Sequence, residues 1–419
     1  MDDKIIESIA LLNIWLEKNG WAGYDPYDIK GNHKYLVLYR CLSGSRSPIL
    51  KALKMGFDNS EVFCPMLIRK IFDIQKEINA KALGLFARSY IDLYNNTQDE
   101  KYREKARYVL DLLAKHSSKG YSGMCWGYPF DWQSLHFLPR GTPSGVVSAC
   151  VGDAFFRGYQ IFGDKKYLDT CQSICNFFMN DLNIDFIDED KLCFSYTPVD
   201  KEHVHNVNLF VAEFLFRIGK EIDNKKYIMY GMKALNYTLN EQNSDGSFYY
   251  FGTEDKIQYN LPEETLKRID HYHTGFVLRS LYSIYTITED EELFLKFRKC
   301  YRHYCHNLFE DKTIPKFTPE DKYPINIHSC AEAILCMSIL HDIFPDALEY
   351  AHNVFLWTKN NMQTKDGWFI YMIVDIKGIK WKVKIPYIRW GQAWMLRALS
   401  QYYFSLHKNE EGKFETNYC

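Results

Sequence analysis

The sequence predicts an all-α fold: an (α/α)6 toroid, in which six helical hairpins close into a ring with long, partly β-ribbon loops on one face. Three observations predict it. Short turns of similar sequence recur along the 419 residues. The helices before and after these turns differ in character, and the connections between successive hairpins are long.

The turns form an internal repeat, which is the strongest sign of a repeat architecture. They occupy residues 98–102, 163–167, 223–227, 289–293 and 344–348, and their last residues lie 65, 60, 66 and 55 positions apart. Each contains an Asp or Glu, which we expect to cap the helix that follows.

The helices on the two sides of each turn differ in pattern. Those before the turn are strongly apolar, and those after it are amphipathic and more charged. Examples are 146–162, 207–218, 276–287 and 331–343 before the turn, and 102–115, 166–179 and 292–308 after it. A helix that is apolar all round belongs inside, so each unit is an inner helix followed by an outer one.

Counting the units closes the ring. Inner helices should begin near residues 78, 144, 206, 274, 329 and 391, and the last of them has no outer partner after it. We expect the first helix, 3–18, to close the ring as the sixth outer helix. Residues 1–419 would then form a single toroid domain, in which 19–77 are an elaboration with a helix at 65–76.

The alternative is an open helical solenoid of the tetratricopeptide kind. Such units are about 34 residues long and have short connections on both sides. Here one connection per unit is short and the other runs to roughly 20–35 residues, and loops of this length in compact domains usually carry function. All the long loops should emerge on one face.

Composition and charge argue against several classes of function and location. The chain has 51 Lys and Arg against 53 Asp and Glu, so a nucleic-acid partner is not expected. The sequence shows no secretory signal, no long apolar run for a membrane span and no C-x-x-C pair, which together favour the cytoplasm. No pattern indicates a metal or another cofactor, and nothing indicates the oligomeric state.

The long loops carry aromatic and polar residues that suit a sugar site. Two segments, 245–250 and 366–371, share the pattern D-G-x-F-x-Y, and each is expected to be a short strand after a turn, where an outer helix ends. His205, His273, His328 and Arg389 each stand near the start of an inner helix. The positive ends of helices that converge on one mouth would favour an anionic ligand.

Six residues are candidates for catalysis. Asp131, Asp270 and Asp321 could supply paired carboxylates for glycoside hydrolysis, although Asp270 could equally cap the helix it precedes. Tyr272, His273 and His328 could transfer a proton. Each histidine could also be structural.

Ten further residues are candidates for substrate binding. They offer rings that stack on sugar faces, hydrogen-bonding groups, and a guanidinium that would clamp a carboxylate or pair with a neighbouring Asp. They are Tyr24, Asp25, Trp126, Trp132, His205, Tyr323, Trp368, Arg389, Trp390 and Gln392.

With these segments in view, the chain resembles the six-hairpin toroid carbohydrate-active enzymes. These include glycoside hydrolases, unsaturated glucuronyl hydrolases, polysaccharide lyases, N-acylglucosamine 2-epimerases and the helical domain of glucuronyl C5-epimerases. Segments 270–276, 324–329 and 388–393 look like those of uncharacterised proteins of bacterial polysaccharide synthesis. The pattern matches no characterised subfamily's catalytic motif, so no catalytic residue is carried over from the resemblance.

The resemblance implies an enzyme that cleaves an acidic poly- or oligosaccharide, by hydrolysis or β-elimination, in a cleft at the toroid mouth. Two alternatives remain open, which are a uronosyl or amino-sugar epimerase and a non-catalytic glycan-binding protein. The partner in each case would be an acidic or neutral glycan.

Overall fold

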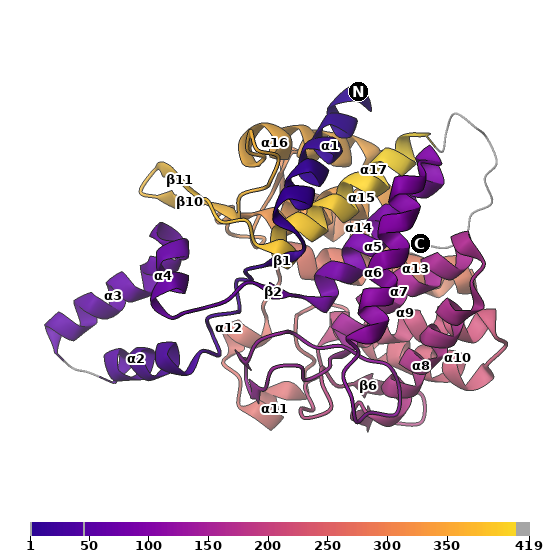
Figure 1. Cartoon of the computed structure of the whole chain (residues 1–419). Helices are drawn as coiled ribbons and strands as arrows, with labels where there is room; N and C mark the ends of the chain where they lie inside the picture. The colour runs from indigo at the N-terminus through magenta and orange to yellow at the C-terminus, as the bar shows by residue number, and fades with distance from the viewer. Residues whose placement is uncertain (1, 45–46, 408–419) are drawn as a thin grey trace.

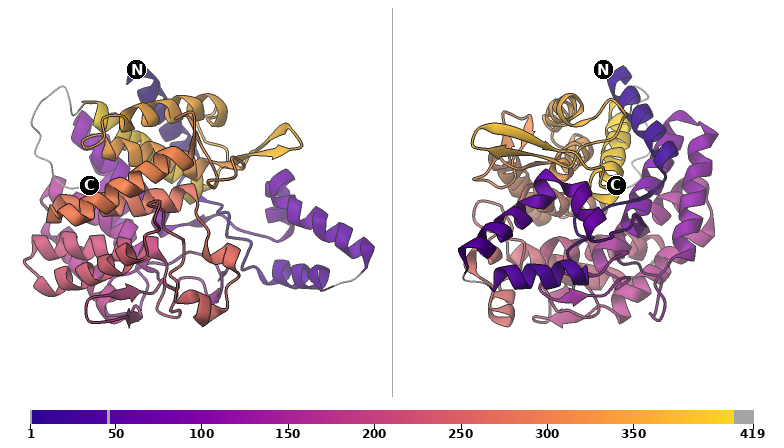
Figure 2. Two further views of the ribbon diagram at one scale, coloured as in Figure 1. Left: turned by 180° about the vertical axis from the view of Figure 1, so that it is seen from behind. Right: turned by 60° about the vertical axis from the view of Figure 1, so that its left-hand side comes forward.

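The computed structural model describes residues 2–44 and 47–407. Twelve of its helices form two concentric layers around a common axis (Figures 1 and 2). The inner helices are α5 (Ala80–Thr97), α7 (Gly145–Phe162), α9 (His205–Glu221), α13 (His271–Thr288), α15 (Ile327–Leu340) and α17 (Trp394–His407). Each contacts the next in this order and α17 contacts α5, so the ring is closed rather than an open superhelix.

The outer helices follow the prediction. They are α1 (Asp2–Asn19), α6 (Glu100–Lys115), α8 (Lys165–Asn180), α10 (Lys225–Asn240), α14 (Glu291–Asn307) and α16 (Ala347–Met362). The first of them, α1, packs against α17 and thereby supplies the sixth outer helix. Two of the turns cap as expected, through Asp99 and Asp290. In the third turn Asn224 caps the helix instead of an acidic residue, and the side chains of Asp164 and Asp346 make no capping bond.

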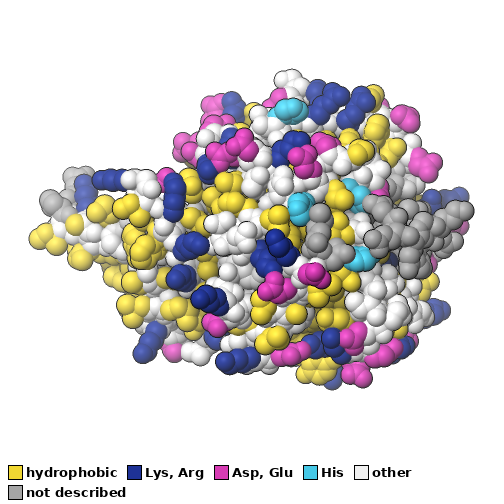
Figure 3. All heavy atoms as spheres, turned by 90° about the horizontal axis from the view of Figure 1, so that it is seen from above, with side chains coloured by type: hydrophobic (Ala, Val, Ile, Leu, Met, Phe, Trp, Pro, Cys, Tyr) yellow, Lys and Arg dark blue, Asp and Glu magenta, His cyan; other side chains and the backbone are white. Residues whose placement is uncertain are grey.

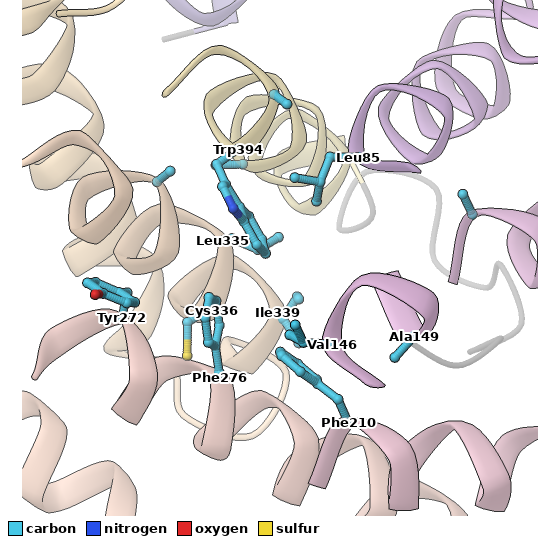
Figure 4. Packing of buried hydrophobic residues seen from close by; sticks show 14 of the residues in the cluster. Leu85, Val146, Ala149, Phe210, Tyr272, Phe276, Leu335, Cys336, Ile339 and Trp394 are labelled. Atoms are coloured by element: carbon cyan, nitrogen blue, oxygen red, sulfur yellow. The ribbon is translucent and has the colours of Figure 1, made fainter. Parts of the chain in front are cut away.

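The apolar character of the inner helices explains the ring. Every residue of α15 is buried. Side chains from all six inner helices point toward the centre of the ring and pack there (Figure 4), among them Leu85, Val146, Phe210, Phe276, Leu335 and Trp394. None of the described helices has the length and apolarity needed to cross a membrane.

The elaboration of residues 19–77 contains more helix than the sequence predicted. It holds α2 (His33–Ser43), α3 (Pro48–Phe63) and α4 (Pro65–Ile71), and its ends are joined by β1 (Ala22–Gly23) and β2 (Glu77–Ile78). Pro65 begins α4 as expected, but the helix ends at Ile71 rather than at residue 76. Asp73 has φ of 53°, a left-handed conformation that a helix cannot continue through.

The long loops carry short hairpins and two short helices. The hairpins are β3 (Trp132–Gln133) with β4 (Phe137–Leu138), β5 (Ile184–Phe186) with β6 (Leu192–Phe194), and β7 (Phe309–Glu310) with β8 (Ile314–Pro315). The helices are α11 (Asp255–Tyr259) and α12 (Glu263–Leu266). A ribbon of β10 (Met372–Ile376) and β11 (Ile379–Val383) pairs with β9 (Ile325–Asn326).

The two D-G-x-F-x-Y segments each contain the expected turn, but no strand follows it within the segment, which corrects that part of the prediction. Gly246 and Gly367 have φ of 93° and 96°. A Cβ at Gly246 would lie 2.4 Å from the carbonyl oxygen of Lys299, and one at Gly367 would lie 2.2 Å from that of Leu11. The shared pattern therefore marks the place where a loop passes against the backbone of an outer helix.

Candidate functional site

A cavity of about 340 Å³ opens at the mouth of the ring, where the inner helices begin. The first turns of α13 and α15 contribute His273 and His328, and η1 (Ile388–Ala393), a π-helical turn that leads into α17, contributes Arg389 and Trp390. Aromatic rings from the long loops complete the wall, namely those of Tyr27, Tyr128, Trp132, Tyr196, Tyr250 and Phe251. The helix starts and loops that the sequence indicated therefore meet in one place.

His273 is oriented by a buried carboxylate. Asp270 caps α13, accepting the backbone N–H of His273 at 3.0 Å, and its Oδ2 lies 2.7 Å from Nδ1 of the same histidine. Burial opposes ionisation of Asp270, but His273 and then Arg268, 3.0 Å away, hold its pKa below the ordinary value. An ionised carboxylate only accepts hydrogen bonds, so Nδ1 carries the proton and Nε2 keeps its lone pair.

The same environment keeps the His273 imidazole neutral. Burial lowers its pKa, and Asp270 offsets only part of that effect. The ring contacts those of Tyr250 and Tyr272, with centroids 4.5 and 4.3 Å away. A neutral imidazole with a free lone pair and a carboxylate behind it has the arrangement of a general base.

His328 also contacts Tyr272. Its ring stacks on that of Tyr272 at 4.7 Å and meets the Trp390 ring edge-on at 4.4 Å. Neither ring nitrogen has a hydrogen-bond partner among the described residues, and the side chain is 1% exposed. Burial, then the nearby Lys81 and Arg389, holds its pKa well below the ordinary value. A buried polar group left without a partner is available to a ligand.

Glu202 adds a carboxyl group that the sequence reading did not single out. It lines the cavity, and burial, followed by the charges of Asp200 and Asp255, raises its pKa to about 8. It is therefore protonated at neutral pH and can donate a proton. The neighbouring Asp200 also lines the cavity, but its oxygens accept from the Thr197 hydroxyl and from three backbone N–H groups.

Arg389 pairs with Asp25 rather than presenting a free guanidinium. Its Nε and Nη2 donate to the two oxygens of Asp25 at 2.6 Å, and both side chains are buried. Of the two roles the sequence left open for Arg389, the structure shows the pairing with a neighbouring Asp. This ion pair forms the wall between the mouth cavity and a second hollow of about 260 Å³, which is lined by Asp25 and Asp131.

Lys81, near the start of α5, and Lys30 are the cavity cations that have no carboxylate partner among the described residues, and Lys81 is the buried one. The Lys81 amine makes no hydrogen bond or ion pair with any described residue. Its Nζ lies 5.7 Å from the ring centroid of Phe276 and 5.4 Å from that of Trp394. Its charge lowers the pKa values of both His273 and His328, so it stands near both imidazoles.

The structure brings together some of the residues that the sequence indicated. Trp132, Tyr272, His273, His328, Arg389 and Trp390 line the cavity, and Asp270 and Asp25 lie directly behind two of them. Tyr24 passes beside this wall, where its carbonyl oxygen accepts the N–H of Ile388.

Other indicated residues lie elsewhere. Asp131 and Asp321 are exposed and do not line the cavity, so the three predicted carboxylates do not converge. Trp126 is core and donates to the Leu113 carbonyl, and Gln392 bonds the backbone of Phe369. His205 is buried against Tyr237, while Tyr323 and Trp368 are half-buried outside the cavity.

Among the described residues, no group of three His, Cys, Asp or Glu side chains is arranged to hold a metal ion. The carboxyl group that sequence reasoning missed, Glu202, stands directly before the His203-Val204-His205 segment that precedes α9. Only its place in a loop that leads into an inner helix could have pointed to it.

Comparison with solved structures shows the fold. The chain is similar to an unsaturated glucuronyl hydrolase specific for heparin (TM-score 0.61, 13% identity, 96% of this chain and 97% of the other). It is also similar to D-mannose isomerase (0.60, 13%, 79% and 87%). A third likeness is to cellobiose 2-epimerase from Bacillus thermoamylovorans (0.56, 11%, 80% and 90%). Neither a family model nor a curated protein matches the sequence. The chain thus has the (α/α)6 toroid fold of these carbohydrate-active enzymes.

Proposed function

We propose that the protein is a carbohydrate-active enzyme that cleaves an acidic saccharide by β-elimination in the mouth cavity. One observation carries the proposal: a neutral, carboxylate-oriented His273 and a protonated Glu202 line the same cavity. Tyr250 also lines the cavity: its ring contacts His273, and burial, followed by the charge of Glu202, raises the pKa of its hydroxyl. In the proposal, base and acid act on one substrate held in this cavity.

The reaction assigns a task to each group. Nε2 of His273 removes the proton from the carbon next to the uronate carboxylate. The electrons of that C–H bond form a carbon–carbon double bond, and the bond to the glycosidic oxygen breaks. Glu202 gives its proton to the departing oxygen. The amine of Lys81, which stands near both histidines, neutralises the carboxylate as negative charge develops there.

Hydrolysis by two carboxylates fits the cavity less well. Such enzymes need a second carboxyl group about 5–9.5 Å from the acid, as nucleophile or base. Asp131 and Asp321 lie outside the cavity, Asp270 is held by His273 and Arg268, and Asp200 is held by Thr197. Glu202 therefore has no uncommitted carboxylate partner among the described cavity residues.

The names of the similar structures support a sugar substrate, and the aromatic wall of the cavity suits the apolar faces of sugar rings. The direct experiment is a screen of acidic and neutral polysaccharides and oligosaccharides, read by product mass and by the ultraviolet absorbance of an unsaturated product. We expect shortened acidic glycans that absorb. Saturated products would show hydrolysis and overturn the elimination step.

A second candidate function is the epimerisation of a uronosyl or amino sugar. The observation that favours it is the pair of imidazoles, His273 and His328, which line the same cavity and both contact the Tyr272 ring, since inversion at a carbon needs two proton-transfer groups. Incubation in heavy water distinguishes the candidates. Deuterium in the sugar ring without chain cleavage would identify the epimerase, and tight binding with no turnover would identify a glycan-binding protein.

A further inference from the structure

A helical arm projects from the ring beside its mouth. It consists of α2, α3 and α4, and Figures 1 and 2 show it standing away from the two helix layers. The β10–β11 ribbon touches it through the middle of β11, where the Trp381 indole donates to the carbonyl of Val62 and meets the Phe63 ring edge-on, with ring centroids 5.5 Å apart. Arm and ribbon together make one continuous surface.

This surface is unusually apolar. Arm and ribbon hold twelve of the 22 large apolar side chains that are exposed among the described residues, with exposures between 38% and 73%. They include Ile49, Leu53 and Met55 on α3 and Met66, Leu67 and Ile71 on α4. The arm's own core is small and consists of Ile29, Tyr35, Ile68 and Phe72. Exposed patches of this kind mark sites of association.

The same surface is strongly basic. Residues 33–76 and 372–384 carry twelve Lys and Arg against four Asp and Glu, whereas the whole chain carries 51 against 53. One of the twelve, Arg69, is buried and paired with Asp28, which leaves eleven. In Figure 3, yellow hydrophobic and dark blue Lys and Arg side chains gather on the lobe at the left of the view. The positive charge of the molecule is therefore concentrated where its apolar side chains are exposed.

We propose that the arm and ribbon dock the protein on an anionic lipid surface, with the apolar side chains in the leaflet that faces the protein and the Lys side chains among the headgroups. Interfacial helices that combine an apolar face with Lys and Arg bind bilayers in this way. The cores of protein–protein interfaces are instead depleted of Lys. The excess of Lys and Arg therefore favours a lipid surface over a protein partner.

Docking through the arm would also place the mouth cavity close to the lipid surface. Lys30 lines the cavity, and Asn32, two residues later, caps α2 by accepting the N–H of Tyr35. The arm is thus joined to the cavity wall by a very short segment. A protein held by its arm presents the mouth cavity close to the lipid surface, where a membrane-attached glycan would meet it. The docking itself does not depend on which reaction the cavity performs.

The test is sedimentation of the full-length protein with vesicles of phosphatidylcholine alone or with added phosphatidylglycerol. We expect binding to the anionic vesicles that weakens as salt is raised, and little binding to the neutral ones. Replacing Ile49, Leu53 and Met55 together by Gln removes apolar contacts. Replacing Lys51 and Lys384 by Glu reverses charge. Each variant should lower the partition coefficient by about tenfold or more.

Matched controls come from exposed residues of the outer helices. Met229→Gln with Leu295→Gln removes comparable exposed apolar side chains, and Lys165→Glu with Lys225→Glu makes the same change in net charge. Both controls should bind like the unmodified protein. Equal loss in arm variants and controls, or no binding to anionic vesicles, would overturn the proposal. A dimer in ultracentrifugation that only the arm variants dissociate would assign the surface to a second copy instead.

Discussion

The rings of Phe276 and Trp394 stack with centroids 5.4 Å apart and close the lumen of the ring below the mouth cavity. Lys81 on the cavity side and Arg279 deeper in the lumen both lie against this pair of rings. Below it, Arg279 is paired with Glu332 at 2.6 Å. The mouth cavity therefore ends on an aromatic floor, and Lys81 is the cation at that floor that no carboxylate of the described residues pairs with.

Lys81 should set the preference for acidic substrates. Lys81→Met keeps most of the side-chain volume and removes the charge. We expect KM for a uronate-containing substrate to rise by about tenfold or more, because a charge-assisted contact is lost, while binding of a neutral glycan of the same length changes little. Steady-state kinetics on the two substrates checks this, with Lys165→Met as the control. Equal effects on both substrates would show that Lys81 acts through packing.

Glu202 should govern activity at alkaline pH. The reaction needs His273 neutral and Glu202 protonated, so the rate should rise at acidic pH as His273 loses its proton and fall as Glu202 ionises near pH 8. In Glu202→Gln the rate should drop by about 100-fold and the alkaline fall should disappear. A pH–rate profile of both proteins measures this. An unchanged alkaline limb would assign that ionisation to another group.

Glu202 also links stability to pH. Its folded pKa of about 8 lies above the ordinary value of 4.5, so between these pH values the folded state holds a proton that the unfolded state releases. Its contribution is present below pH 4.5 and is lost as pH rises toward 8. Glu202→Gln should therefore gain stability relative to the unmodified protein between these pH values, by roughly 2–4 kcal/mol at pH 8. Urea unfolding of both proteins at pH 5 and pH 8 tests the sign. If the free energy of unfolding of Glu202→Gln fell relative to that of the unmodified protein as pH rises, the linkage would be contradicted.

The Arg389–Asp25 pair should contribute to stability because each buried charge neutralises the other. Either Arg389→Gln or Asp25→Asn leaves one buried charge unpaired, and we expect each to lower the free energy of unfolding by about 3–5 kcal/mol. The double variant should lose less than the sum of the two, because it leaves no lone charge. Denaturant unfolding of the unmodified protein, the two single variants and the double variant gives the four free energies of a double-mutant cycle. Additive losses would show that the two side chains act independently.

Gly367 should tolerate no side chain. Gly367→Ala places a Cβ 2.2 Å from the Leu11 carbonyl oxygen and also forces a left-handed residue. Gly378→Ala is the matched control, since Gly378 has φ of 89° and open space around its Cβ position. The control should cost about 1 kcal/mol and Gly367→Ala several kcal/mol more. Thermal unfolding compares them, and equal losses would mean that conformation alone requires the glycine.

Much of the fold could be predicted because it depends on local pattern. An inner helix such as α15 is apolar all round, so its burial is evident before its partners are known. The arm could not be predicted in the same way. The apolar side chains of α3 are largely exposed, so their spacing reflects no buried face, and of its three helices only α4 was expected.

The site was predictable at the helix starts and not in the loops. His273 and His328 stand on helices whose ends must converge, which fixes their place. Asp131 and Asp321 belong to loops whose path depends on distant contacts, such as the ion pair between Arg140, in the loop of Asp131, and Glu77. Glu202 becomes an acid only through its burial beside Asp200 and Asp255, which no local pattern reveals.

The central claim is that His273, oriented by Asp270, removes the proton from an acidic sugar held in the mouth cavity. The most direct measurement is the rate of unsaturated product formation by His273→Gln, compared with His271→Gln, a change two residues away on the same helix whose side chain does not line the cavity. We predict a loss of at least about 100-fold in His273→Gln and near-normal activity in the folded His271→Gln control. Full elimination activity in a folded His273→Gln protein would contradict the account.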